Sequence, residues 1–307
     1  GMTYWYLGVK WCIDIIKRHF PDTPLLLGGI YAQLCPDHAQ TCGADGVQTT
    51  YLDFPLRRPA LDLYENPGYG VTITSIGCPM HCKYCASGKL WPRYGKRSID
   101  EVIDEVSFQA GISSVKDMAF YDDALLMDKE GHFYPLCERL KEGFSDLRFH
   151  TPNGLHVREI DELCARYLFK TGFKTIRLSF EGTDPAVQRA SSDKVCNSQY
   201  VKAVENLLNA GYCLEDLETY ILVGLPGQSY ESVKKAILFV KSLDATVKLA
   251  EYSPIPGTAM FEECAKNFPQ LRTEPLYQNN TAYCGYMTPN ITQNHLQELK
   301  DLANSRK

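Results

Sequence analysis

Short strand-like runs alternate with longer helical runs along most of the chain. From residue 71 onward, six runs rich in apolar and β-branched residues are separated by stretches whose apolar positions have helical spacing. We expect strands at 71–76, 115–121, 148–151, 175–180, 218–223 and 247–252. Six such repeats with right-handed crossovers predict an α/β fold, a parallel sheet curled into a partial (β/α)6 TIM barrel. A flat, doubly wound sheet is the alternative.

Capping signals mark the helices between these strands. Ser98 is followed three residues later by Glu101, the pattern of a reciprocal cap, and predicts a helix over 99–109. Gly172 and Gly211 stand where helices are expected to end, and glycine readily adopts the left-handed conformation of a C-terminal cap.

The first fifty residues form a smaller α/β pattern of their own. A helical run over 9–20 ends at Pro21, and a short apolar strand, a second helix to about residue 42 and a second strand follow. The tract 49–70 contains prolines and glycines without periodicity, which indicates a linker. We therefore divide the chain into a partial Rossmann-like segment (1–55), the barrel (56–258) and a helical extension (259–307).

Composition narrows the class of protein. The chain has 307 residues, 44% hydrophobic and 22% charged, typical of a globular protein. Its longest apolar stretch, around Leu26, is far below the roughly 18 residues of a membrane span, and no signal peptide is visible. We expect a cytoplasmic protein without membrane contact. The net charge of -5 argues against nucleic acid as a partner.

Three of the twelve cysteines lie within eight positions, in the loop after the first expected strand. Cys78, Cys82 and Cys85 have the spacing C-x3-C-x2-C, at the end of a parallel strand where ligand chemistry collects. Structural zinc usually takes four ligands in two pairs, and no second pair is present; His81 directly precedes Cys82 and is a poor fourth ligand. Three thiolates suit an iron-sulfur cluster with one iron open. Zinc and inert structural thiols remain the alternatives.

The loop "CPMHCKYC" at the end of the first strand of six repeats resembles the radical S-adenosylmethionine superfamily. The resemblance implies a [4Fe-4S] cluster whose unique iron binds the amino and carboxylate groups of S-adenosylmethionine. An electron from the cluster then cleaves this cofactor to methionine and a 5'-deoxyadenosyl radical, which abstracts hydrogen. It also implies a small-molecule substrate and an electron donor such as flavodoxin or ferredoxin.

The same resemblance assigns the other cofactor contacts. Asp122 and Asp123 end the second strand, where the family holds the methionine amino group; a helix cap is the alternative. Ser179 and Glu181 end the fourth strand, where ribose and carboxylate contacts are expected. The remaining expected contacts are two cations for the carboxylate and an apolar wall for the adenine: Arg189, Lys194, Leu222, Val223, Gly224 and Tyr84.

Residues 1–50 resemble the C-terminal half of a cobalamin-binding domain that often precedes such barrels, with Gly28 and Gly29 as its cofactor contacts. The Asp-x-His-x-x-Gly segment that supplies the axial histidine is missing, and His38 lies elsewhere. We therefore do not expect this chain to bind cobalamin. A cobalamin-dependent methyltransferase in a longer parent chain is the alternative function.

Two further features call for a simple interpretation. The tract "GKLWPRYGKR" interleaves four cations with Trp91 and Tyr94, a pattern that can bind anions, but we expect a solvated face. Cys264 and Cys284 lack the close spacing of an auxiliary cluster, so we expect a single cluster.

Overall fold

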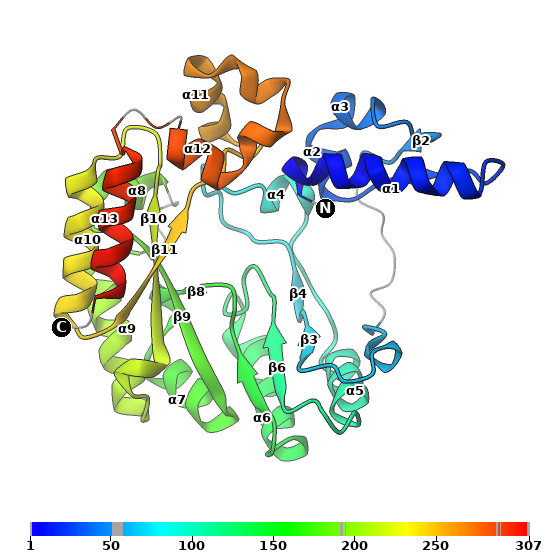
Figure 1. The fold of residues 1–307 in the computed structure, drawn as a ribbon. Helices are drawn as coiled ribbons and strands as arrows, with labels where there is room; N and C mark the ends of the chain where they lie inside the picture. The colour runs from blue at the N-terminus through cyan, green and yellow to red at the C-terminus, as the bar shows by residue number, and fades with distance from the viewer. Residues whose placement is uncertain are drawn as a thin grey trace.

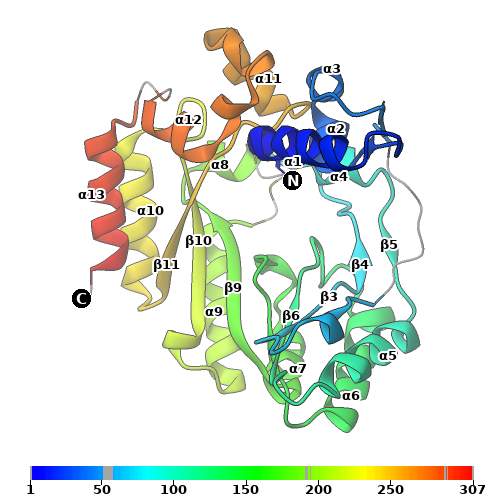
Figure 2. The same ribbon diagram turned by 45° about the vertical axis from the view of Figure 1, so that its right-hand side comes forward.

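The main feature of the fold is an open, curved sheet of parallel strands (Figures 1 and 2). The computed structural model describes residues 2–50, 58–190, 193, 195–286, 288 and 290–305. Six strands pair in parallel in the order β11-β10-β9-β7-β6-β3, and a short β8 adds to β9. No pairing joins β3 to β11 among the described residues, so the sheet stays open and the predicted partial barrel is confirmed. The strands are β3 (Gly70–Thr72), β6 (Asp117–Phe120), β7 (Arg148–His150), β8 (Leu155–His156), β9 (Phe173–Glu181), β10 (Leu217–Val223) and β11 (Thr246–Glu251).

Helices cover the outer face of this sheet. Strand residues alternate between two faces, and the outward face carries large apolar side chains. Phe120, Phe149 and Phe173 meet there, with ring centroids 5.3 to 5.7 Å apart. The covering helices are α5 (Ile99–Ala110), α6 (Tyr134–Gly143), α7 (Glu162–Thr171), α9 (Asn197–Ala210) and α10 (Tyr230–Ser242).

The predicted caps are present. Ser98 and Glu101 form the reciprocal cap of α5, each side chain bonding the other residue's backbone amide. Gly172 ends α7 and Gly211 ends α9, both in the left-handed conformation. These signals therefore located the helix boundaries correctly.

The first expected strand, 71–76, is divided into two. β3 ends at Thr72, and the chain then turns into β4 (Ser75–Ile76), which pairs antiparallel with β5 (Gly95–Lys96) rather than with the main sheet. An apolar run indicates an extended chain but not which neighbour it pairs with, so periodicity could not show this break.

The free edge of β3 is covered by side chains. The Gln109 amide accepts a hydrogen bond from the Val71 N–H at 2.9 Å and donates to the Val71 carbonyl at 2.8 Å, as a neighbouring strand would. Arg97 donates to the carbonyl of Ile73 at 2.8 Å. Exposed strand edges invite pairing with other chains, and these contacts remove that opportunity.

The N-terminal segment forms a small unit beside the barrel mouth (Figure 1). It has its own apolar cluster around Ile13, Tyr31 and Cys42. The Tyr6 hydroxyl donates to Glu274 of the C-terminal extension at 3.3 Å, which fixes the unit against that extension. The elements are η1 (Thr3–Trp5), α1 (Tyr6–His19), β1 (Leu26–Leu27), α2 (Ile30–Leu34), α3 (Pro36–Gln40) and β2 (Gly46–Val47), with β1 and β2 parallel.

The C-terminal extension shares the core of the barrel. Cys284 and Leu296 are buried in the same apolar cluster as the strands. Its helices are α11 (Ala259–Asn267), α12 (Asn280–Tyr286) and α13 (Gln293–Asn304), and α13 packs on α10 and β11. The expected boundary near residue 56 lies outside the described residues, so the division into 1–55, 56–258 and 259–307 stays a prediction.

Replacing Gln109 by Ala should destabilise the barrel by about 1–3 kcal/mol, because it leaves the N–H and C=O of Val71 without these partners in a half-buried place. Urea unfolding followed by circular dichroism measures the change. Gln297→Ala, which removes only an exposed bond to Asp301, is the control and should shift stability by less than about 0.5 kcal/mol. Equal midpoints for the two variants would contradict the proposed covering of the edge.

Candidate functional site

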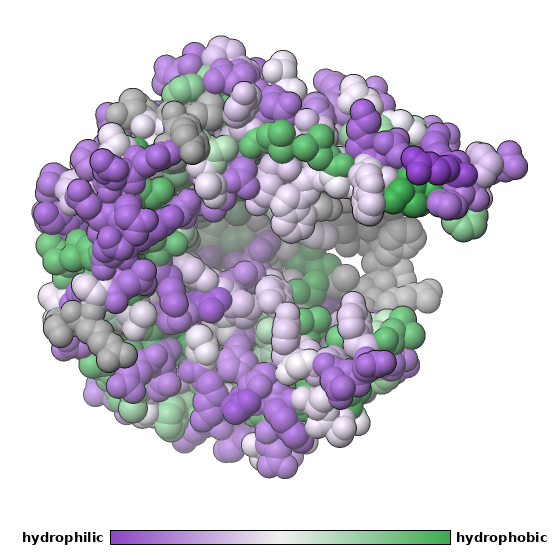
Figure 3. Space-filling view, in the orientation of Figure 1, coloured by the Kyte–Doolittle hydropathy of each residue, from purple (hydrophilic) through white to green (hydrophobic). Residues whose placement is uncertain are grey.

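A cavity of about 390 Å³ opens at the C-terminal ends of the strands and contains the three cysteines. The space-filling view shows the molecule hollowed at its centre (Figure 3). Cys78, Cys82 and Cys85 line the cavity together with Tyr84, Ser87, Asp123, Pro152, Asn153, Gly154, His156, Ser179, Glu181, Tyr220 and Ala250. The structure thus brings the cysteine loop together with strand-end residues that are distant in sequence.

The cysteine loop turns sharply out of β4. Gly77 has a φ of 76°, a conformation that glycine adopts without strain, and Cys78 follows directly. The Cys85 N–H donates to the Cys82 carbonyl at 3.1 Å, which closes a turn between two of the thiols. The Lys83 N–H donates at 2.9 Å to the carbonyl of Ala190, the last residue of α8 (Pro185–Ala190), so the loop is tied to the barrel.

The donor set fits an iron-sulfur cluster better than a single metal ion. Within the described residues, no three His, Cys, Asp or Glu side chains are arranged to hold one ion. A tetrahedral zinc needs its sulfurs about 2.3 Å from the metal, hence close together. A cubane cluster places each thiolate on a different iron and so takes them farther apart. Three thiols around one cavity, with room beside them for a further ligand, suit the second arrangement.

Asp122 has a structural role in the fold. Its carboxylate is buried and accepts hydrogen bonds from the backbone N–H and the hydroxyl of both Thr74 and Ser75, at 2.6 to 3.0 Å. Burial raises the pKa of Asp122, although these donors act in the opposite direction. Asp122 therefore holds the start of the cysteine loop against the end of β6, and it does not line the cavity.

Asp123 has the opposite environment. Its side chain is exposed, lines the cavity and accepts a hydrogen bond from the Ser87 hydroxyl at 2.5 Å. Ser87 is buried, begins α4 (Ser87–Leu90), and also donates its backbone N–H to the Cys85 sulfur at 3.4 Å. Of the two neighbouring aspartates, only Asp123 is placed to meet a ligand in this cavity.

Glu181 ends β9 in a conformation that is unusual for a residue with a side chain. Its φ is 68°, and the pairing of β9 with β10 shifts register at this point. Non-glycine residues held in this region are strained and occur often at functional sites. The Glu181 carboxylate is buried and accepts a hydrogen bond from the Tyr84 hydroxyl at 3.1 Å. Burial, and then the neighbouring Glu181, raises the pKa of Tyr84 well above its usual value, so Tyr84 stays a neutral donor.

Ser179 lies against a glycine. A Cβ on Gly154 would come 2.1 Å from the Ser179 hydroxyl oxygen, so only glycine allows this approach. Asn153, the preceding residue, donates its side-chain N–H groups to the carbonyls of Tyr121 and Asp122 at 2.9 and 3.1 Å. The sequence "TPNGLH" directly follows β7, and this position at a strand end is the signal that marks these cavity residues.

The other expected contacts that the structure describes do not line this cavity. Arg189 is exposed on α8 and is absent from the cavity wall as far as the structure describes it, and Lys194 lies outside the described residues. Leu222 and Val223 are buried. Gly224 faces the C-terminal extension, because a Cβ there would meet the Cys284 sulfur at 2.4 Å. Gly224 is thus explained by the close approach of the Cys284 side chain. The adenine contact of residues 222–224 stays a prediction.

Two of the four cations in the basic tract after the cysteines form internal ion pairs. Arg97 pairs with Glu105 at 2.9 Å, and both side chains are largely buried. Lys96 pairs with Asp128. These pairs reduce the charge that the tract could offer to an anion.

The remaining cysteines are not arranged as a second cluster in the part of the chain that the structure describes. The Cys264 sulfur contacts the Tyr283 hydroxyl at 3.0 Å. The Cys284 thiol points to the carbonyls of Val223 and Tyr252. Both are buried and free.

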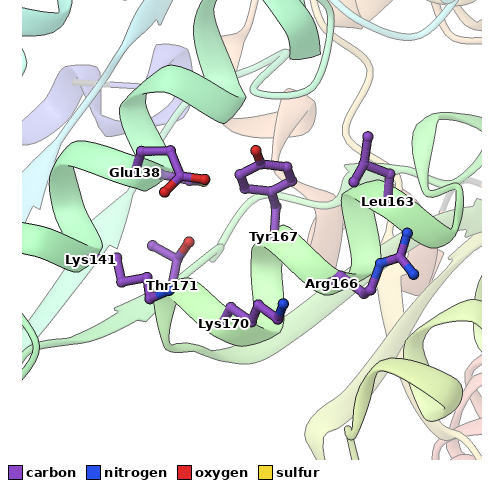
Figure 4. A pocket seen from close by; sticks show the side chains of 8 residues that line it. Glu138, Lys141, Leu163, Arg166, Tyr167, Lys170 and Thr171 are labelled. Carbon is purple, nitrogen blue, oxygen red and sulfur yellow. The ribbon is translucent and has the colours of Figure 1, made fainter.

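A second cavity, of about 210 Å³, lies between α6 and α7 on the outside of the barrel (Figure 4). Glu138 and Tyr167 face one another across it, and Lys141, Arg166 and Lys170 surround it. Arg166 is paired with Glu162 at 2.9 Å. None of the candidate cofactor residues lines this cavity.

Comparison with known proteins agrees with this geometry. The family model described as "Radical SAM superfamily" matches residues 72–240, more than half of the chain. The chain belongs to the radical SAM superfamily. This family implies a [4Fe-4S] cluster and S-adenosylmethionine. The assignment of Cys78, Cys82 and Cys85 as the cluster ligands stays a prediction.

Relatives and solved structures extend this result. An uncharacterized methyltransferase of Pyrococcus horikoshii is 27% identical over 216 residues, 67% of this chain and 45% of that protein. A tRNA-2-methylthio-N(6)-dimethylallyladenosine synthase of Sulfurihydrogenibium sp. is 25% identical and matches 62% of this chain and 45% of its own length. The chain therefore spans less than half of these curated relatives.

Two solved structures share the fold at low identity. The radical S-adenosylmethionine methyltransferase TsrM of Kitasatospora setae superposes with a TM-score of 0.69 at 17% identity, covering 85% of this chain and 62% of its own. The cobalamin-dependent S-adenosylmethionine radical enzyme OxsB gives a TM-score of 0.63 at 10% identity, covering 98% of this chain and 51% of its own.

No described helix is long and apolar enough to cross a membrane.

Replacing Asp122 and Asp123 by alanine one at a time should distinguish their roles. Asp122→Ala leaves four buried donors of Thr74 and Ser75 without an acceptor and should cost about 3–5 kcal/mol of stability. Asp123→Ala removes an exposed carboxylate and should change stability by less than about 1 kcal/mol. Urea unfolding and iron content after reconstitution measure both. Equal stability of the two variants would overturn the structural role of Asp122.

Proposed function

We propose that this protein reductively cleaves S-adenosylmethionine and uses the resulting radical on a small organic substrate. One observation carries the proposal: three thiols of a C-x3-C-x2-C loop open into the same cavity as Asp123, Ser179 and Glu181. The cavity lies at the C-terminal ends of parallel strands, where such barrels perform their chemistry.

A cluster held by Cys78, Cys82 and Cys85 would supply the one electron needed to cleave S-adenosylmethionine to methionine and a 5'-deoxyadenosyl radical, which would abstract hydrogen from the substrate. The residues of the chain bind and orient. We assign Asp123 to the methionine ammonium, because an ammonium needs acceptors and this carboxylate is exposed to the cavity. We assign Ser179 and Glu181 to the ribose hydroxyls and the Tyr84 ring to the adenine.

The substrate and the electron donor belong to the same proposal. The donor is a low-potential protein such as flavodoxin or ferredoxin. Tyr220 and Ala250 on the inner face of the sheet give the cavity a wall on which a small molecule can rest. Two relatives are named for modifying tRNA and a ribosomal protein. A macromolecular substrate is therefore the alternative that a substrate screen should include.

Cobalamin-dependent methyl transfer by a longer protein is the second candidate. TsrM and OxsB are described with cobalamin, and the OxsB superposition covers 98% of this chain, so it includes most of the N-terminal unit. In that unit, Trp11 and Leu26 are 65% and 62% exposed beside a groove lined by α1 and β1. Apolar surface of this kind is normally covered. His38 lies outside any Asp-x-His-x-x-Gly segment, and its Nδ1 is hydrogen bonded to the Tyr31 hydroxyl at 2.5 Å. We therefore do not assign it as the axial ligand.

Anaerobically reconstituted protein should form 5'-deoxyadenosine from S-adenosylmethionine and dithionite, and Cys82→Ala should reduce the product at least a hundredfold. Liquid chromatography with mass spectrometry measures the product. Cys213→Ala, at an exposed cysteine outside the cavity, is the matched control and should keep full activity. Absence of product from wild-type protein with a full cluster would contradict the proposed reaction.

The chain alone should not retain cobalamin. After mixing with hydroxocobalamin and gel filtration, the protein fraction should lack the absorbance of the cofactor, because residues 1–50 provide only a two-stranded sheet and no Asp-x-His-x-x-Gly segment. Co-elution at a stoichiometric ratio would show that these residues suffice for binding.

A further inference from the structure

The cysteine loop carries two hydroxyl groups, one on each side of Cys85. Tyr84 precedes this cysteine and donates to Glu181, the last residue of β9, at 3.1 Å. Ser87 follows it by two positions and donates to Asp123, just after β6, at 2.5 Å. The loop is thus bonded to carboxylates from two different strands of the barrel mouth.

These two carboxylates are the acidic side chains of the cavity wall in the described chain. Asp122, their neighbour in sequence, is bonded away from the cavity to Thr74 and Ser75. Both cavity carboxylates are therefore oriented by the loop that holds the cluster ligands.

We propose that Tyr84 and Ser87 are positioning residues through which the cysteine loop sets Glu181 and Asp123 for the cofactor, so that loading of the cluster strengthens binding of the nucleoside. The inference rests on the proposed function for the identity of the ligand. It adds a coupling between the cluster site and the nucleoside site. Chelation of the methionine group by the iron does not itself require such a coupling.

The physical reason is pre-organisation. A carboxylate side chain that can rotate must be ordered when the ligand binds, and a bond that already fixes it removes this cost. A carboxylate offers about four lone-pair positions to donors, and each hydroxyl bond uses one of them. Because Tyr84 and Ser87 flank a cluster ligand, ordering of Cys85 by iron also orders both hydroxyls.

Two nucleosides distinguish the halves of the site. 5'-Methylthioadenosine has the adenine and ribose but no amino acid, whereas S-adenosylhomocysteine has both. Tyr84→Phe keeps the aromatic ring, loses the bond to Glu181, and should weaken both nucleosides about tenfold. Ser87→Ala should weaken S-adenosylhomocysteine about tenfold and leave 5'-methylthioadenosine unchanged.

Isothermal titration with cluster-loaded and cluster-free protein measures the coupling. 5'-Methylthioadenosine has no amino and carboxylate groups to chelate the iron, so stronger binding after loading must come through the loop. We expect a gain of severalfold in wild type and its loss in Tyr84→Phe. Tyr230→Phe and Ser242→Ala, which remove hydroxyls from exposed bonds on α10, are the matched controls. Glu181→Gln combined with Tyr84→Phe should weaken binding no further than Glu181→Gln alone, because Tyr84 acts through Glu181.

Three results would overturn the proposal: unchanged affinities in both variants, parallel losses for both nucleosides in Ser87→Ala, or failure of wild type to bind either nucleoside. A lowered melting temperature with unchanged affinities would assign the hydroxyls a structural role only. The outcome is separate from that of 5'-deoxyadenosine formation. Tyr84-dependent nucleoside binding without product would retain the inference and reject the reaction, and product with unchanged affinities would do the reverse.

Discussion

The buried carboxylate of Asp122 is the constraint on which the site depends. It receives the amides and hydroxyls of Thr74 and Ser75, so the chain leaving β3 must pass directly over the end of β6. Removing this buried carboxylate would leave several buried donors of Thr74 and Ser75 without an acceptor. The loop that begins two residues after Ser75 therefore starts from a fixed point.

From that point the loop is tied down on both sides of the cavity. The Lys83 amide is bonded to α8, the Tyr84 hydroxyl to the end of β9 and the Ser87 hydroxyl to the residue after Asp122. Three thiols in eight residues are thus presented by a loop with contacts to three separate elements. Rigid support of this kind is what a binding site on a loop needs to hold its ligands in place.

The sequence predicted the barrel and the cluster loop well, because both depend on local patterns. Alternation identified the six strands, capping identified the helix ends, and the cysteine spacing identified the loop. It could not show that Asp122 is structural and that Asp123 lines the cavity, because these neighbours in sequence differ in burial and in hydrogen-bond partners. Nor could it show that Gly224 is covered by Cys284, a contact between residues 60 positions apart. Ser87 and Asn153 have common residue types, and only the fold shows that they belong to the cavity.

The open side of the barrel limits how a large substrate could bind. An extended peptide joins a sheet by pairing with free N–H and C=O groups at its edge. At β3, both groups of Val71 are bonded to Gln109, and the carbonyl of Ile73 is bonded to Arg97. The Arg97 charge is in turn matched by Glu105, so the arrangement is stable away from water. Strand addition is therefore blocked at Val71 and Ile73, and a large substrate that reached this side of the barrel would have to be recognised by side chains.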